Sequence, residues 1–546
     1  MPFEAAVWID QFAVPGFHHD SRSAFTIDGL QSVHVSHEVD ATIGDTSAGL
    51  ITLATRGGDH LDLVIGNVST REAIAAFRDD FATAVVRTSL LGFVASPGGD
   101  RVFVDAPNAQ DAQLRLTVYK HDHLDVMATA FATRDQVAVS GDNDTRFEAL
   151  DDFGRATIAA RYSDATWAAT SAQSIGASKR VLERGLLQHA NVDEVSFDSR
   201  EDLRHRLTDI AGLAELVWTL GVEAHATRHD LDLAGPADDR ENIPRAGIGP
   251  GDDVSHVYRG VVWTPDVAAA TGLFAVLAKN IEAYAGLRLD AFGSDVALEP
   301  RGALTLALGE QHSLELSAGA YRRAAEQGEE LEHAELHPER TSRVELRLDK
   351  LLGRTFYNAS MYYADRTHLI VRDQLGHLAN TGNGTTYGAY ALFGQHRGHW
   401  IGQLAVRLEH DERQDAPRGV VRPFEYSQPI RLEARLVRFV GPWSFGARWE
   451  LRQGLPYAQV VGSDYDSDRD VYTPFFGDLY GERLPWQHQL DVRIDRAWRR
   501  IAVFLDVANV YDHRDTIGWA YNFDFTQRRA VQGSPILPTL GVRGQL

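Results

Sequence analysis

The chain has 546 residues, of which 44% are hydrophobic, and it contains no cysteine. The lack of cysteine excludes disulfides and cysteine-ligated zinc or iron–sulfur sites. A formal net charge of -22 leaves no basic footprint, so we expect no nucleic-acid partner. The mean hydropathy of -0.26 is typical of a soluble protein, but also of a β-barrel in which only alternate strand residues face lipid.

The N-terminus, Met1–Ala5, has neither a charged region nor an apolar region of the kind a secretory signal needs. A mature, trimmed or fragmentary chain would explain this, and so would a cytoplasmic protein. No run of about 18 apolar residues occurs, which excludes a transmembrane helix.

The first 56 residues differ from the rest of the chain. Short strand patterns are predicted at Val7–Asp10, Ser32–Val35 and Ala48–Arg56, with a Pro-Gly loop after the first. Gly44 and Gly49 suit tight turns in a small domain, because glycine tolerates close backbone approach.

A strict alternation of apolar and polar residues begins near residue 113. Leu114, Leu116 and Val118 oppose Gln113, Arg115 and Thr117. The same pattern recurs at 313–320, 343–349, 431–436, 443–452 and 489–495, and each predicts a strand. In a soluble sandwich the apolar face would meet a second sheet, whereas in a membrane barrel it would meet lipid.

Between the strands predicted at 114–119 and 126–131 stands His121-Asp122-His123. Two histidines at this spacing can bind one metal ion. The last histidine of the corresponding metallohydrolase motif is absent, because Val126 stands there. A polar turn is therefore the preferred interpretation.

The stretch 202–220 allows a helix from its leucine spacing. Because its neighbours all have strand patterns, we predict a strand, a turn and a second strand here.

Three features favour a membrane barrel over a soluble sandwich. The polar rows carry charges of both signs, and aromatic residues gather near strand ends, as at Phe356-Tyr357 and Trp443. Short connections, such as Gly441-Pro442, alternate with long acidic ones, predicted at 141–152, 230–253 and 462–478.

Asp464, Asp466, Asp468 and Asp470 alternate strictly in the last of these connections. Alternating carboxylates place hard oxygens on one side of an extended loop, which suits Ca²⁺, although a plain acidic outer loop is the simpler interpretation. The pattern is not an EF-hand, because Arg469 and Phe475 stand where glycine and glutamate are needed. No phosphate loop, nucleophile elbow or His-Glu-x-x-His motif occurs, so we expect no enzyme.

Ordered motifs continue to the end of the chain. They are Glu299-Pro300-Arg301, Leu336–Arg340, Asn380–Gly384, Gly454-Leu455-Pro456-Tyr457, Arg483-Leu484-Pro485, Asp506–Tyr511 and Pro538–Leu546. In this order and spacing they resemble the TonB-dependent receptor family over nearly the whole chain. The resemblance implies an all-β fold, namely a transmembrane β-barrel of about 22 antiparallel strands with a partial plug domain inside.

By the same resemblance, residues 1–58 correspond to the C-terminal half of a plug domain, and residues 59–546 to the barrel. Gln11 and Ile43 replace a glycine and an aromatic residue of the family's plug, and Leu546 replaces its terminal aromatic residue. The first half of the plug and the TonB-box segment are expected to be missing.

The resemblance implies an outer-membrane transporter that takes up a scarce solute of the ferric chelate, cobalamin or oligosaccharide class. Expected partners are outer-membrane lipid, lipopolysaccharide and the small-molecule substrate, with TonB only if a missing N-terminal segment exists. The alternatives are a non-coupled barrel, acting as a passive pore or a structural, partner-binding component, and a soluble all-β protein.

A histidine-rich loop of the plug is the candidate ligand site. It consists of Phe17, His18, His19, Asp20 and Arg22. Neutral imidazoles there suit a metal-bearing ligand, although a solvated loop or a contact with the barrel wall is the simpler interpretation. We expect no cofactor beyond the Ca²⁺ considered above.

Overall fold

In the computed structural model, the described residues are 6–9, 12–13, 30–36, 41–42, 50–55, 60–66, 71–78, 81–90, 102–140, 146–184, 188–207, 213, 215–235, 256–293, 295–324, 336–350, 353–372, 378–467 and 471–545. Every regular element within them is a β-strand. None of these residues belongs to a helix long and apolar enough to cross a membrane.

The strands follow one another along the whole chain. They are β1 (Ala6–Ile9), β2 (Phe12–Ala13), β3 (Leu30–Ser36), β4 (Leu50–Thr55), β5 (His60–Gly66), β6 (Arg71–Arg78), β7 (Ala82–Leu90), β8 (Val102–His121), β9 (Leu124–Ser140), β10 (Arg146–Ser163), β11 (Trp167–Arg184), β12 (Gln188–Leu207), β13 (Glu215–Gly235), β14 (His256–Ala278), β15 (Ile281–Phe292), β16 (Asp295–Ala307), β17 (Ser313–Arg323), β18 (Glu339–Lys350), β19 (Thr355–Arg372), β20 (Leu378–Arg397), β21 (Trp400–Gln414), β22 (Val421–Arg422), β23 (Ile430–Val440), β24 (Trp443–Arg452), β25 (Pro456–Tyr457), β26 (Val460–Asp466), β27 (Val471–Phe476), β28 (Glu482–Arg483), β29 (Gln487–Trp498), β30 (Ile501–Ala508), β31 (Thr516–Tyr521), β32 (Arg528–Gln532) and β33 (Leu537–Gln545).

The N-terminal strands form a separate four-stranded sheet in the order β2-β1-β4-β3. Strand β4 lies between β1, which it pairs with in parallel, and β3, which it pairs with antiparallel.

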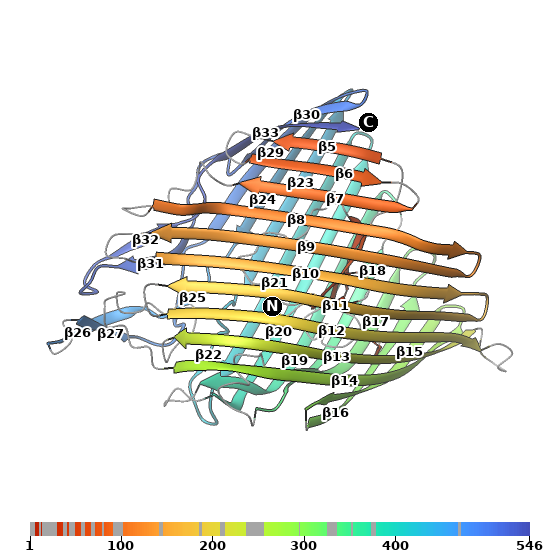
Figure 1. The fold of residues 1–546 in the computed structure, drawn as a ribbon, viewed down its shortest axis with the longest axis horizontal. Coiled ribbons are helices and arrows are strands. Elements are labelled where there is room, and N and C mark those ends of the chain that lie inside the picture. The colour runs from red at the N-terminus through yellow and green to blue at the C-terminus, as the bar shows by residue number, and fades with distance from the viewer. Residues whose placement is uncertain are drawn as a thin grey trace.

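The remaining long strands form one closed, antiparallel barrel (Figure 1). The closed sheet contains 23 strands within the described residues, and one of them, β22, has only two residues and pairs with β21 alone. The wall itself is therefore made of 22 strands, as predicted. The barrel closes where β33 pairs with β5, with Gly541 opposite Gly66.

The apolar–polar alternation divides the wall into two faces. On β15, Leu287 and Leu289 are 41% and 44% exposed, whereas Arg288 and Asp290 between them are each 5% exposed. A charged side chain can be this well covered only on the inner face of the barrel, where other polar groups surround it. The apolar rows point outward, away from the lumen.

The two ends of the barrel differ in their connections. At the short-turn end, two residues join β8 to β9, β20 to β21, β23 to β24 and β29 to β30. At the long-connection end, residues 236–255, 415–429, 453–486 and 509–536 link neighbouring strands, and the small hairpins β26–β27 and β31–β32 lie there, on the left of Figure 1.

Two local predictions are confirmed. Strand β12 ends at Leu207 and β13 begins at Glu215, which is the strand–turn–strand arrangement expected for 202–220. His121 ends β8, and residues 122–123 form the expected polar turn.

The predicted bounds of three long connections are wrong. Strand β10 already begins at Arg146, so the connection predicted at 141–152 spans only 141–145. Strand β13 continues to Gly235, and residues 462–478 contain most of the β26–β27 hairpin. Some of the acidic residues assigned to these loops lie on strands instead, as does Asp152 of β10, which pairs with Arg134 of the neighbouring strand β9 at 2.7 Å.

Candidate functional site: the inner wall of the barrel

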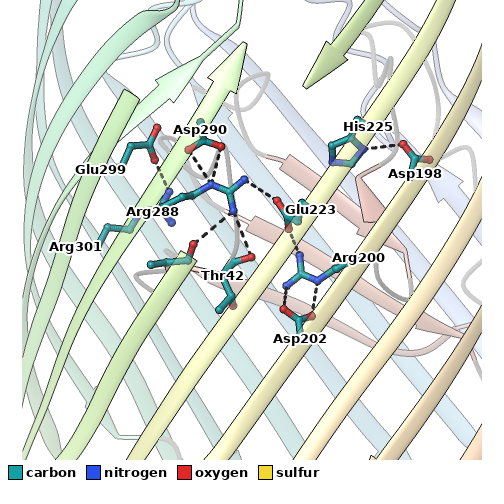
Figure 2. Close-up of polar contacts among 11 residues, drawn as sticks. Thr42, Asp198, Arg200, Asp202, Glu223, His225, Arg288, Asp290, Glu299 and Arg301 are labelled. Atoms are coloured by element: carbon teal, nitrogen blue, oxygen red, sulfur yellow. Dashed lines mark hydrogen bonds and ion pairs between the residues drawn. The ribbon is translucent and has the colours of Figure 1, made fainter. Parts of the chain in front are cut away.

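A set of charged side chains lies on the inner face of four wall strands. We call it the inner-wall network, and it comprises Asp198, Arg200 and Asp202 of β12, Glu223 and His225 of β13, Arg288 and Asp290 of β15, and Glu299 and Arg301 of β16 (Figure 2). The strand register creates it, because Arg200 lies opposite Glu223, and Arg288 lies opposite Glu299.

Arg288 is the centre of the network. Its Nη2 donates to Glu223 Oε2 at 2.6 Å, and its Nε lies 2.9 Å from both carboxylate oxygens of Asp290. Its Nη1 lies 3.5 Å from the carbonyl oxygens of Ala41 and Thr42. One guanidinium therefore ties two wall carboxylates to the backbone of the N-terminal segment, as Figure 2 shows.

Glu223 joins two arginines. Besides Arg288, it accepts a hydrogen bond from Arg200, whose Nε also donates to Asp202 Oδ2 at 2.5 Å. On β16, which lies beside β15, Arg301 Nη2 donates to Glu299 Oε2 at 2.8 Å. Each buried charge named here has an oppositely charged partner, which is the condition for keeping such charges away from water.

The N-terminal segment approaches the wall closely at this place. The backbone N–H of Ala41 donates to the Tyr284 hydroxyl at 2.7 Å. A Cβ at Gly221 would lie 3.0 Å from the Thr42 Cβ, and one at Gly286 would lie 2.8 Å from the Ala41 Cβ. Glycine at both wall positions leaves the room that Ala41 and Thr42 occupy, and both of these residues are buried.

A buried histidine lies nearer the long-connection end. His229 is fully buried, with Nδ1 3.0 Å from Glu194 Oε1 and Nε2 2.8 Å from the Thr264 hydroxyl. The second oxygen of Glu194 accepts from the Ser178 hydroxyl at 2.6 Å. Because both ring nitrogens of His229 are engaged, this cluster holds β11, β12, β13 and β14 together and offers no free metal ligand from the imidazole.

At the long-connection end, one connection folds back onto the inner wall. Phe424, which is 3% exposed, packs against Leu369 and Val371 of β19. A Cβ at Gly384 of β20 would lie 2.7 Å from the Phe424 ring, so glycine again provides the space for an inward contact. The connection 415–429 thus narrows the barrel on the side of β19 and β20.

A cluster of ion pairs holds this connection in place. Arg422 donates to Asp415 at 2.7 Å and to Glu425 at 2.9 Å, and its guanidinium lies 4.9 Å from the centre of the Tyr480 ring. Burial raises the pKa of the Asp415 carboxyl. The hydrogen bonds and positive charges of Arg422 and Arg413 lower it by more, so the pKa lies below its usual range. Two long connections are therefore bound to each other.

The predicted site residues are not brought together by the described structure. Phe17, His18, His19, Asp20 and Arg22 lie outside the described residues. Asp464 and Asp466 lie on β26, and Asp464 is exposed, while Asp468 and Asp470 lie outside the described part of the chain. Within that part, no group of three His, Asp or Glu residues is placed to hold a metal ion. Both site hypotheses stay predictions.

The inner-wall network was missed from the sequence. The sequence singled out Glu299-Pro300-Arg301 only as a motif of the family resemblance, and such a motif does not say which strands lie beside it. The available signal was a glycine followed two residues later by a charge on an inward row, as in Gly221 with Glu223 on β13 and Gly286 with Arg288 on β15.

A family model for the TonB-dependent receptor-like β-barrel matches residues 86–510. Solved structures agree in fold. The outer membrane transporter YddB from Escherichia coli has a TM-score of 0.73 at 11% identity, with 100% of this chain and 90% of that chain covered. The FrpB iron transporter from Neisseria meningitidis has a TM-score of 0.73 at 13% identity, with 100% and 93% covered.

The siderophore receptor PirA from Acinetobacter baumannii has a TM-score of 0.73 at 11% identity, with 100% of this chain and 91% of that chain covered. No curated protein sequence matches the chain. The family consists of outer-membrane transporters and receptors rather than enzymes, and its barrels lie in the outer membrane. On the family match and the shared fold together, this chain belongs to the TonB-dependent receptor family of outer-membrane β-barrels.

Proposed function

We propose that this chain takes up a scarce solute across the outer membrane by displacing its own N-terminal segment from the barrel wall. The solute classes proposed are ferric chelates, cobalamin and oligosaccharides. Among these, ferric chelates come first, because two of the similar structures are an iron transporter and a siderophore receptor.

The observation that carries the proposal is the contact of Ala41 and Thr42 with the inner-wall network. A segment that is bound inside the barrel obstructs the lumen. Buried arginine contacts that hold such a segment are therefore not expected in a barrel that acts as an open pore. The segment is held by two long hydrogen bonds that Arg288 donates and by one that Ala41 donates to the Tyr284 hydroxyl. So few hydrogen bonds can hold the segment in place and still allow its displacement. We therefore propose residues 1–58 as the C-terminal half of a plug domain and residues 59–546 as the barrel.

In this proposal the specificity lies at two places. The first is the loop at residues 17–22, with His18 and His19 as ligands for a metal-bearing solute. The second is the long-connection end, where the connection around Phe424 narrows the lumen. The energy for displacing the segment is proposed to come from the proton-motive force through TonB, on the condition that a segment with a TonB box precedes these residues.

Two measurements test the proposal against a passive pore. Purified chain in a planar lipid bilayer is expected to show no steady conductance. Cells that express it are expected to accumulate radiolabelled iron as ferric catecholate or ferric hydroxamate chelates only while a proton-motive force exists. Steady conductance together with energy-independent uptake would overturn the transporter and support the passive pore.

A calcium site at 464–470 is proposed separately. Asp464 and Asp466 both belong to β26 and are two residues apart in its sequence, the spacing at which residues of a strand share a face. If Ca²⁺ binds there, the thermal unfolding midpoint in detergent rises on addition of Ca²⁺ and not on addition of Mg²⁺. The double variant Asp464→Asn, Asp466→Asn removes that rise, and a wild-type protein indifferent to Ca²⁺ would contradict the site.

A further inference from the structure

A basic and aromatic surface lies on the outer face of the barrel at its short-turn end. We call it the arginine–tryptophan patch, and its central residues are Trp400 of β21, Arg438 of β23, Trp443 of β24, and Arg496 and Trp498 of β29. The three tryptophans are 38% to 44% exposed. They belong to the outward rows, so the patch faces the membrane.

Each arginine of the patch stacks on tryptophan. The Arg438 guanidinium lies 4.7 Å from the centre of the Trp400 ring, directly across the strand pair. The Arg496 guanidinium lies 4.9 Å from Trp443 and 4.4 Å from Trp498. Such stacking engages the flat face of a guanidinium and leaves its N–H edge to bind an oxyanion.

Within the part of the chain that the structure describes, the Arg496 guanidinium stacks on tryptophan rings but forms no ion pair. Its Nε is buried from solvent and makes no hydrogen bond within the described part of the protein. The two Nη groups of Arg496 carry the remaining four N–H donors, and within the described residues they likewise have no hydrogen bond or ion pair. These Nη groups are the ones that an oxyanion outside the chain would bind.

The charge of this region is opposite to that of the whole chain. The stretches 392–404, 436–446 and 494–504 contain five arginines and one acidic residue, Asp495. Asp495 points inward and pairs with Arg493 at 2.9 Å. Within the described residues, none of the five (Arg397, Arg438, Arg496, Arg499 and Arg500) has a carboxylate partner. In a chain of net charge -22, this is a local cationic surface.

One turn of the region keeps an arginine where its neighbours use glycine. Gly398 and Gly441 have positive φ angles of 58° and 57° in the turns after β20 and β23. In the turn after β29 the equivalent conformation, φ 47°, is adopted by Arg499. A side chain is disfavoured in this conformation, so arginine at position 499 lowers the stability of the folded chain relative to glycine. We take the positive charge of Arg499 to have a role that offsets this cost.

We propose that the arginine–tryptophan patch binds the phosphate headgroup of an anionic phospholipid. Tryptophans on the outer face of a barrel end mark the level of the lipid headgroups. Guanidinium N–H groups bind phosphate oxygens through charge-assisted hydrogen bonds. Next to the patch, Leu436, Phe445 and Leu505 are exposed on the outward rows and provide an apolar surface for the acyl chains.

The position of the arginine–tryptophan patch at the short-turn end indicates which membrane leaflet supplies the lipid. Short turns of such barrels face the periplasm, and the membrane leaflet there contains phospholipid rather than lipopolysaccharide. Phosphatidylglycerol, with one net negative charge, is therefore the expected occupant.

The test uses the full chain, purified in a non-ionic detergent and titrated with phosphatidylglycerol, with lipid retention measured by native mass spectrometry. The wild-type protein is expected to retain phosphatidylglycerol in preference to zwitterionic phosphatidylcholine. Arg438→Gln or Arg496→Gln should weaken phosphatidylglycerol binding about fivefold each, and the pair about 25-fold. Added salt should reduce the difference between the two lipids.

Two further variants keep the result interpretable. Arg499→Gly removes a charge while relaxing the backbone, so it should weaken lipid binding without lowering the thermal unfolding midpoint. Arg206→Gln, at the same barrel end, removes an arginine that is paired with Glu215 at 2.9 Å and should leave lipid binding unchanged.

The outcomes are separable. Equal retention of the two lipids by the wild-type protein overturns the proposal, and so does unchanged phosphatidylglycerol binding by the folded double variant. Retention of lipid A instead of phosphatidylglycerol, lost in the same variants, also overturns it, because the occupant would then be an outer-leaflet lipid. These measurements do not depend on solute uptake.

Discussion

Arginines lie on both faces of the barrel wall, and they are compensated in different ways. On the inner face, Arg200 and Arg288 share Glu223, and each has a further carboxylate partner. On the outer face, Arg438 and Arg496 stack on tryptophan rings. The inner arginines are neutralised by the chain itself, whereas the outer ones carry unneutralised charge at the membrane.

The difference reflects the surroundings of each face. Inside the barrel, the N-terminal segment covers part of the wall, and a buried charge there must be paired. At the outer face, aromatic rings and the membrane interface surround the guanidinium, which can bind groups that the chain does not supply. One alternating strand pattern thus builds a self-contained contact on one face and a surface for an external partner on the other.

The largest expected effect is a difference in the free energy of unfolding between a variant of an inner-face arginine and a variant of an outer-face arginine. Arg288→Met leaves Glu223 and Asp290 short of a partner in a buried place, so it should lower the free energy of unfolding by about 3–5 kcal/mol. Guanidinium titration of the detergent-solubilised chain measures this. The matched outer variant, Arg438→Met, should change it by less than about 1 kcal/mol. Equal losses in the two variants would remove the distinction between the faces.

A smaller effect is expected from filling the space beneath the N-terminal segment. Gly221→Leu places a side chain where Thr42 lies, so it should destabilise the docked segment by about 1–3 kcal/mol. The cost is expected to appear as faster proteolysis of the N-terminal segment, with the barrel intact on a gel. Gly446→Ala is the control, because a Cβ there would meet only ordinary contacts at 3.8 Å. Unaltered proteolysis of Gly221→Leu would contradict the docking.

The smallest effect is expected at the solvent-exposed carboxylate of Asp164, whose charged form is stabilised mainly by hydrogen bonds. In the turn after β10, Asp164 accepts from the Tyr162 hydroxyl at 2.6 Å and from the backbone N–H groups of Trp167 and Thr166 at 2.7 Å. These hydrogen bonds lower the pKa of Asp164 to about 2.

Because this pKa is depressed on folding, the stabilisation is present above the unfolded-state pKa of about 4 and is lost as the pH falls toward 2. The thermal midpoint of the wild-type protein should therefore fall over this range by more than that of Asp164→Asn. Parallel pH curves for the two proteins would show that Asp164 contributes nothing.

The sequence was sufficient for the strands but not for the contacts between them. The alternation at 443–452 predicts β24 because one face of the strand meets apolar surroundings and the other meets polar ones. The meeting of Arg288 with Glu223 depends on the register of β13, β14 and β15, which no single strand pattern specifies. The role of Gly221 likewise becomes visible only when Thr42 is placed against it.

Strand ends were harder to predict because charge was taken as evidence for loops. Asp232 lies within the connection predicted at 230–253, yet it is part of β13. There it accepts from Arg259 of β14 at 2.6 Å and lies 3.1 Å from His189 of β12. Cross-strand ion pairs of this kind let a strand continue beyond its apolar stretch.

The docking of the N-terminal segment on the inner wall is the central claim, and a single engineered disulfide tests it most directly. The chain has no cysteine, so the pair Thr42→Cys, Gly221→Cys can form only one disulfide. A Cβ at Gly221 would lie 3.0 Å from the Thr42 Cβ, close to the spacing of about 3.5–4.5 Å that a disulfide requires.

After mild oxidation of cells expressing this pair, denaturation in SDS without reductant should leave both thiols protected from a maleimide–polyethylene glycol label. Uptake by the oxidised cells should stop until a reductant is added. The control pair, Thr42→Cys with Val222→Cys, places the second thiol on the outward face and should stay fully labelled. Full labelling of the Thr42–Gly221 pair after oxidation, or undiminished uptake by the cross-linked protein, would contradict the docked segment as the gate of this barrel.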